Sequence, residues 1–227
     1  MINIEKLSSV PLILHPWSHK IIDELFTAST FSILETAAVQ LMPLVKNQDR
    51  MFVHPFKLES LGIDNTVYKT LIDCANMLLT AIDSTLATFP NSNKSTMGYF
   101  CLPHFAISGP QYGYKIHNDS MHRALTVLTY VAPSASIGTT IYKTKEQDSF
   151  VNQVAWKQNR TFVLTPSDSS WHSWHNTSNV SRVTVDFTCH KLESLHEVLA
   201  HMRENDKDEL TEWFFKEMNN GNLIINI

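Results

Sequence analysis

His117 and Asp119 stand one residue apart in the segment YKIHNDS, and both side chains are able to bind a divalent metal ion. The segment has the composition of a strand, on which the side chains of residues i and i+2 point to the same face. An imidazole and a carboxylate would then face the interior of a β-sandwich or barrel together. The pair supplies two metal ligands, so a third must come from a distant part of the chain.

The segment SSWHSWHN contains two candidates for the third ligand, His172 and His175. Their odd separation would place the two imidazoles on opposite faces of an extended segment. Two histidines and one carboxylate form a metal-binding face that leaves coordination positions open, and this arrangement is typical of non-haem Fe(II) oxygenases. The residues alone leave the choice between the two histidines open.

The strand-like segment RVTVDFTC alternates an apolar and a polar face. Arg182 and Thr184 share the polar face, and together they can bind a carboxylate, since the guanidinium offers a bidentate fork and the hydroxyl a further donor. Tyr114 is a possible additional donor to the same carboxylate. The alternative is that Arg182 forms a structural ion pair with Asp186 or Asp168.

The composition indicates a globular protein of 227 residues, with 43% hydrophobic and 18% charged residues. The net charge of −4 and the lack of a Lys/Arg cluster argue against nucleic acid as a partner. No apolar run is long enough for a membrane span, and the N-terminus does not resemble a signal peptide. Three widely spaced cysteines suggest no disulfide framework. We therefore expect a cytoplasmic protein that does not contact membranes.

The pattern of apolar residues predicts one α+β domain over residues 1–227. Residues 18–46 and 65–87 have helical spacing, so we expect residues 1–95 to be helical. Short β-branched and aromatic runs between residues 97 and 189 predict the strands of a sandwich or barrel. Residues 190–227 are expected to form C-terminal helices. Helices that flank such a β core are expected to cover one of its faces.

The combined pattern resembles a known family. The order Y-x-x-H-x-D, then a distal histidine, then R-x-T is similar to that of the Fe(II)- and 2-oxoglutarate-dependent dioxygenases, especially their prolyl 4-hydroxylase-like branch. The resemblance covers about residues 97–189, including the segments GTT and NRTFVLTPSDSSWHSWHN. It implies a double-stranded β-helix, also called a jelly roll, with the N- and C-terminal helices packed on the major sheet.

The resemblance implies that His117, Asp119 and His172 hold the Fe(II) ion. His172 is preferred to His175 because it stands ten positions before Arg182, which is the spacing seen in the family. His175 would then lie at the rim of the pocket, and it remains the alternative ligand.

The resemblance also implies that Arg182, assisted by Thr184 and Tyr114, binds the distal carboxylate of the cosubstrate 2-oxoglutarate. The expected activity consumes O2, releases succinate and CO2, and hydroxylates an unactivated C–H bond of an amino acid, peptidyl or protein side chain. The Gly-Gly-Glu-Thr segment common in the branch is only IGTT here, which weakens an assignment to proline. The alternatives are a cupin-like metal enzyme, or a non-catalytic jelly-roll binding domain, neither of which uses 2-oxoglutarate.

Overall fold

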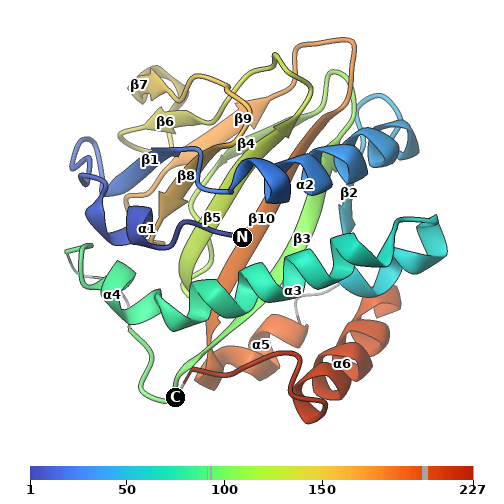
Figure 1. Ribbon diagram of the computed structural model, residues 1–227. Coiled ribbons are helices and arrows are strands. Elements are labelled where there is room, and N and C mark those ends of the chain that lie inside the picture. The colour runs from blue at the N-terminus through green and yellow to red at the C-terminus, as the bar shows by residue number, and fades with distance from the viewer. Residues whose placement is uncertain (91, 93, 201–203, 227) are drawn as a thin grey trace.

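The protein is built around two antiparallel β-sheets, with long helices covering one side of the larger sheet (Figure 1). The computed structural model describes residues 1–90, 92, 94–200 and 204–226, with the backbone alone for 204–207. The larger sheet has the strand order β1-β8-β5-β10-β3-β2, and the smaller sheet has the order β4-β9-β6-β7. The strands are β1 (His19–Asp23), β2 (Arg50–Val53), β3 (Tyr99–Ser108), β4 (Gly113–His117), β5 (Arg123–Ala132), β6 (Thr140–Tyr142), β7 (Phe150–Gln153), β8 (Arg160–Leu164), β9 (His172–His175) and β10 (Arg182–Lys191).

Strand β10 lies between β5 and β3 and is buried on both faces. Its residues pair with β3 without a register shift from Arg182 to Lys191. The apolar face, formed by Val183, Val185, Phe187 and Cys189, has no exposed surface and belongs to the main hydrophobic core. The polar face, formed by alternate residues from Arg182 to His190, points away from that core. The alternation in the sequence therefore separates the core of the protein from the side that carries the candidate site.

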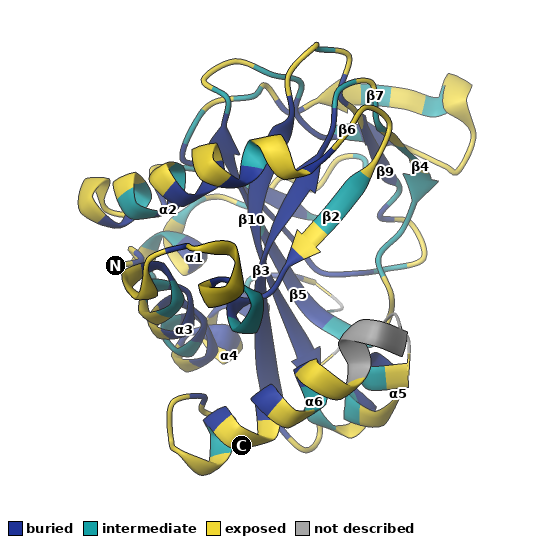
Figure 2. Cartoon of the chain, turned by 90° about the vertical axis from the view of Figure 1, so that its right-hand side faces the viewer, coloured by how far each residue is buried: buried dark blue, intermediate teal, exposed yellow. Residues whose placement is uncertain are grey.

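Helices α2 (Ala28–Leu41) and α3 (Asn65–Thr80) cover the outer face of the larger sheet, where buried side chains of both helices join the main core (Figure 2). Short helices α1 (Glu5–Ser9) and α4 (Ile82–Leu86) border them. Helices α5 (Leu195–Ala200) and α6 (Glu204–Asn219) form a second apolar cluster against β3 through Phe100 and Leu102. The expected α+β class and the C-terminal helices are confirmed. No helix among the described residues is long and apolar enough to cross a membrane.

The prediction of one helix over residues 18–46 is wrong in its first part. Residues 19–23 form β1, which pairs with β8, and the helix begins only at Ala28. Ile22, Leu25 and Phe26 are buried, and their spacing is also typical of one face of a helix. Glu24 has a positive φ of 56°, which is not compatible with a continuous α-helix. These residues form a strand because their backbone N–H and C=O groups pair with those of β8. The local sequence pattern does not reveal a partner so far along the chain.

Strand β2 is a second departure from the expected helical N-terminal part. It pairs with β3 and forms one edge of the larger sheet, while β1 forms the other edge. Residues 1–95 therefore supply two strands as well as the covering helices. The edge strand β2 places Arg50 beside the candidate site.

Candidate active site

The structure brings His117, Asp119 and His172 together between the two sheets. His117 ends β4 and lies directly opposite His172 on β9, with 4.3 Å between the two ring centroids. Asp119 follows β4 by two residues. Each of the three side chains offers one ligand atom, and these atoms lie within 4.8 Å of one another. The chain can therefore present two imidazoles and one carboxylate to a single metal ion.

Both imidazoles are oriented by backbone carbonyl groups. His117 Nδ1 lies 3.0 Å from the carbonyl oxygen of Lys115, and His172 Nδ1 lies 2.8 Å from that of Ser170. A carbonyl oxygen can only accept, so each Nδ1 carries the proton and donates it. The Nε2 atom of each ring is then free to bind a metal, and contacts of this kind typically orient metal-binding histidines.

The carboxylate of Asp119 is held in its ionised form. Its Oδ1 accepts from Arg123 Nη1 at 2.8 Å, and its Oδ2 accepts from Thr126 Oγ1 at 2.8 Å. Burial raises the pKa of Asp119, but the charges of Arg123 and His172 and the bond from Thr126 outweigh it and hold the pKa well below its usual range. Burial, followed by the neighbouring His172, lowers the pKa of His117 to about 4. At neutral pH the carboxylate is charged and His117 is neutral, which are the forms that bind metals.

His175 lies away from this group. It ends β9 in an exposed position opposite Gly113, whereas His172 is buried. A Cβ atom added at Gly113 would lie 2.9 Å from His175 Cδ2, so a larger residue there would displace the His175 side chain. The two histidines thus occupy opposite sides of β9.

Arg182 lies at the start of β10 and is only 2% exposed. Its guanidinium carbon lies 4.6 Å from the ring centroid of Trp174, 5.1 Å from that of Trp156 and 5.6 Å from that of Tyr130. Burial lowers its pKa to about 10, and its Nε has no hydrogen-bond partner. Among the described residues Arg182 forms no salt bridge with Asp186 or Asp168, although the charge of Asp186 acts to raise the pKa of Arg182.

The other two residues predicted to bind the cosubstrate differ in their positions. Thr184 is buried two residues after Arg182 on β10. Both side chains line a small recess together with Arg50, Ser108, Trp174 and Asp186. Tyr114 lies with its ring edge-on to His117, 4.4 Å between centroids, and stacks on Trp174. Tyr114 therefore lies beside the metal-binding group, and it is absent from the residues that line the recess.

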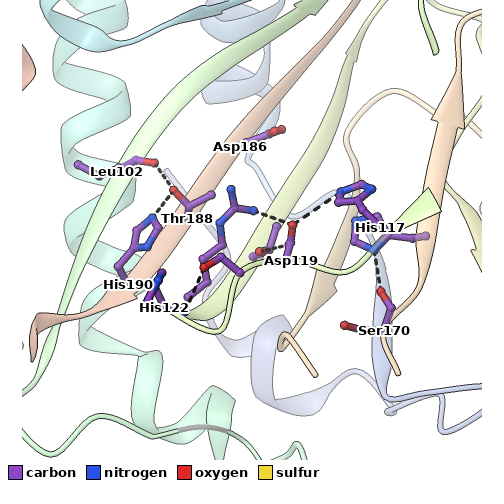
Figure 3. A network of polar contacts seen from close by, with 12 residues as sticks. Leu102, His117, Asp119, His122, Ser170, Asp186, Thr188 and His190 are labelled. Atoms are coloured by element: carbon purple, nitrogen blue, oxygen red, sulfur yellow. Dashed lines mark hydrogen bonds and ion pairs between the residues drawn. The ribbon is translucent and has the colours of Figure 1, made fainter. Parts of the chain in front are cut away.

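A cavity of about 1110 Å³ opens beside the three clustered side chains. Its wall includes the buried pair His104 and Asp186, whose Nε2 and Oδ2 are 3.7 Å apart, and also His190 and Arg50. Figure 3 shows Asp186 and His190 projecting from β10 on the side where Asp119 lies. His104 Nδ1, Asp186 Oδ1, His190 Nδ1 and Arg50 Nε are buried without hydrogen-bond partners.

Sequence reasoning missed these four residues as parts of the site. The alternation of β10 placed Asp186 on the polar face, and continuing it by two steps would have included His190. His104 stands opposite Asp186 on β3, and only the pairing of the two strands brings them together. Arg50 had no local signal, because β2 was not expected.

No protein-family model matches the chain, and no curated protein matches its sequence. Solved structures do match it. A prolyl-4-hydroxylase from Pseudomonas putida is 14% identical, with a TM-score of 0.54, over 83% of this chain and 96% of that one. The viral collagen prolyl hydroxylase of Paramecium bursaria Chlorella virus-1, solved as a 2-oxoglutarate complex, is 12% identical, with a TM-score of 0.52, over 77% and 96%.

A prolyl hydroxylase from Trichoplax adhaerens, solved with a peptide fragment of the oxygen degradation domain of hypoxia inducible factor, is 14% identical. Its TM-score is 0.53, over 85% of this chain and 89% of that one. Likeness at such low identity concerns the fold. The chain therefore has the double-stranded β-helix fold of these enzymes, with helices packed on the larger sheet, as the sequence predicted.

Proposed function

We propose that the protein is an Fe(II)- and 2-oxoglutarate-dependent dioxygenase that hydroxylates an unactivated C–H bond of an amino acid, peptidyl or protein side chain. One observation carries the proposal above the rest. The group of His117, Asp119 and His172 lines the large cavity, and Arg182, a buried guanidinium without a salt bridge among the described residues, lines a recess that shares Arg50, Leu128, Trp174 and Asp186 with that cavity. Enzymes named for this type of chemistry share the fold.

The donor set fits Fe(II). Two imidazoles and one carboxylate suit an iron ion and leave further positions for a chelating cosubstrate and for O2. Arg123 and Thr126 fix the carboxylate of Asp119, and the carbonyls of Lys115 and Ser170 fix the two rings. The metal site is therefore preorganised by the chain.

The position of Arg182 fits the far end of 2-oxoglutarate. His172 and Trp174 are two residues apart on β9, so their side chains share a face about 7 Å apart. The guanidinium of Arg182 packs on Trp174. Arg182 thus packs on the residue two positions beyond His172, where a five-carbon dicarboxylate bound to the metal at one end would place its other carboxylate.

When bound, iron and 2-oxoglutarate supply the oxidising chemistry, in which O2 is consumed, succinate and CO2 are released and the substrate gains a hydroxyl group. The chain orients the reactants. Arg182 and Thr184 hold the distal carboxylate, while Trp156, Trp174 and Tyr130 surround the guanidinium with aromatic rings that exclude water. A dry environment strengthens the ion pair between guanidinium and carboxylate.

The cavity has room for a substrate beside the cosubstrate, since pockets of about 300–1,000 Å³ hold whole small ligands. Its wall near His104 and Asp186 is polar, which supports a substrate group that forms hydrogen bonds. The Trichoplax neighbour was solved with a peptide, which supports a peptide or a small molecule as substrate.

Cys74, Cys101 and Cys189 are unpaired and buried, which supports a reducing compartment such as the cytoplasm.

Neither alternative function, a cupin-like enzyme or a non-catalytic binding domain, would explain why the buried Arg182 has no salt-bridge partner among the described residues. Succinate release tests the proposal against both. The protein is incubated in air with Fe(II) and 2-oxoglutarate, with and without mixtures of amino acids and peptides, and succinate is measured. We expect wild-type protein to form succinate and His172→Ala to form none. If folded wild-type protein bound neither the metal nor 2-oxoglutarate, the proposed function and the cupin-like enzyme would both be excluded. The non-catalytic binding domain would then be the remaining hypothesis.

A further inference from the structure

Arg50 is a second arginine that faces the same recess as Arg182. In the larger sheet, Arg50 on β2 pairs with Ser108 on β3, and Ser108 pairs with Arg182 on β10. Residues directly opposite one another in antiparallel strands project from the same face of the sheet. The two arginines therefore project from one face, two strands or about 10 Å apart at their backbones.

The two guanidinium groups converge on one aromatic ring. The guanidinium carbon of Arg50 lies 5.5 Å from the centroid of Trp174, and that of Arg182 lies 4.6 Å from it. Phe52 and Tyr114 hold Arg50 in this direction, with ring centroids at 4.2 Å and 4.9 Å. After burial, the positive charge of Arg50 is a further cause of the lowered pKa of Arg182.

Among the described residues, Asp186 is the acid whose charge acts on both cations, and it forms a salt bridge with neither. Neither Arg50 nor Arg182 forms a salt bridge among the described residues, and the Nε atoms of both are buried without partners. Asp186 is the one acid that lines the recess, and its Oδ2 faces His104 at 3.7 Å. Two like charges in a poorly solvated site repel each other strongly unless an anion binds between them. Burial raises the pKa of Asp186 and so opposes its negative charge, and an anionic ligand would relieve the repulsion between the two arginines.

We propose that Arg50 and Arg182 together bind the distal carboxylate of 2-oxoglutarate, so that β2 supplies a cosubstrate-binding residue. The inference rests on the proposed function. A carboxylate has about four lone-pair sites, so it can accept from two guanidinium groups and from a hydroxyl group at once. Thr184 and Ser108 line the recess between the arginines and provide such hydroxyls. The motifs of the jelly-roll core supply one arginine to this site, Arg182, and the N-terminal part of the chain supplies the second, Arg50.

Binding of two 2-oxo acids to protein loaded with Mn(II) tests this inference by calorimetry. 2-Oxoglutarate has the distal carboxylate, whereas 2-oxopentanoate has the same chelating end without it. We expect Arg50→Met to weaken 2-oxoglutarate binding by about 10- to 100-fold, the range for a lost charge-assisted hydrogen bond. The affinity for 2-oxopentanoate should stay within about twofold of wild type, because that ligand has no carboxylate in the recess.

Two further variants serve as controls. Lys145→Met removes an exposed positive charge between β6 and β7 that does not line the recess, and its affinity for 2-oxoglutarate should match wild type. Arg50→Lys keeps the charge but loses the fork, and its affinity should fall between those of wild type and Arg50→Met. Thermal melting confirms that each variant is folded.

Equal 2-oxoglutarate affinity in Arg50→Met and wild type would overturn the inference and leave the proposed function standing. An equal loss for both 2-oxo acids would also overturn it, since Arg50 would then act on the shape of the site. If wild-type protein binds Mn(II) but not 2-oxoglutarate, the proposed function itself fails, and the role of Arg50 fails with it.

Discussion

The two faces of β10 are buried to almost the same extent but differ in chemistry. Phe187 and its apolar neighbours are 0% exposed and pack against the helices, while the five cavity-facing residues from Arg182 to His190 are 2–6% exposed. Apolar residues on the first face gain free energy from burial. On the second face, Arg182 Nε, Asp186 Oδ1 and His190 Nδ1 are buried without partners, which costs free energy in the folded protein.

Under the proposed function, the apolar face of β10 holds the fold and the polar face binds ligands. A buried polar atom without a partner is rare in proteins, and several of them on one side of one strand need an explanation. A bound dicarboxylate and a polar substrate would supply the missing partners. Substitutions on the two faces should therefore change different properties.

The largest effect is expected on the helix-facing side. Phe187→Ala removes a fully buried ring from the core and should lower the free energy of unfolding by about 3–5 kcal/mol. Urea denaturation measures this, with the exposed Phe150→Ala as a matched control that should change it by less than about 0.5 kcal/mol. A loss below about 1 kcal/mol at Phe187 would contradict the assignment of this face to the core.

The next effect is expected at the metal group. Asp119→Ala removes the carboxylate and should weaken Fe(II) or Mn(II) binding more than about 100-fold, since changes that only support a ligand already cost 10- to 100-fold. Competition with a chromogenic chelator measures the affinity. Asp168→Ala, which removes a nearby acid outside the group, should leave it unchanged. Equal metal affinity in Asp119→Ala and wild type would exclude Asp119 as a ligand.

A smaller effect with opposite signs is expected at Arg182. Arg182→Met replaces an unpartnered buried cation by an apolar side chain, so the melting temperature of the ligand-free protein should stay the same or rise. The affinity for 2-oxoglutarate should fall by about 10- to 100-fold. Calorimetry and thermal melting on the same sample measure both. A large fall in stability without a loss of affinity would assign Arg182 to the fold instead.

The smallest effect is expected at a satisfied ion pair far from the cavity. Arg160, the main cause, and Lys157 lower the pKa of Asp23 to about 2 and tie β1 to β8. Because the folded pKa lies below the unfolded value near 4, the contribution is complete above pH 4 and is lost as the pH falls towards 2. Asp23 is partly exposed, so Asp23→Asn should cost less than about 1 kcal/mol at pH 7.

Urea denaturation at pH 7 and at pH 2.5 checks this prediction. The difference between wild type and Asp23→Asn should shrink at the lower pH, where wild-type Asp23 becomes partly protonated. A difference that is as large at pH 2.5 as at pH 7 would show that the charge of Asp23 does not stabilise the fold.

The sequence predicted the parts of the fold and site that depend on local alternation. The period of two in β10 placed Arg182 and Thr184 on one face, and the spacing of His117 and Asp119 placed both beside the cavity. Edge strands were beyond this reasoning, because β1 and β2 are defined by partners far along the chain. Arg50 was missed for the same reason.

The position of Tyr114 depended on a detail that spacing does not reveal. Residues three apart on a regular strand point to opposite faces, yet the rings of Tyr114 and His117 are in contact. A register shift between these residues in the pairing of β4 with β9 brings the rings to one side. Such irregularities re-aim side chains and occur beside active sites.

The central claim is that His172 helps to bind Fe(II) in the cavity and that 2-oxoglutarate then chelates the bound ion. An anaerobic titration of metal-free protein with Fe(II), followed by 2-oxoglutarate, tests it through the weak visible charge-transfer band of the Fe(II)–2-oxoglutarate chelate. We expect the band in wild type and in His175→Ala, and its loss in His172→Ala. A band that persists in His172→Ala but disappears in His175→Ala, or no band in folded wild-type protein, would contradict the account.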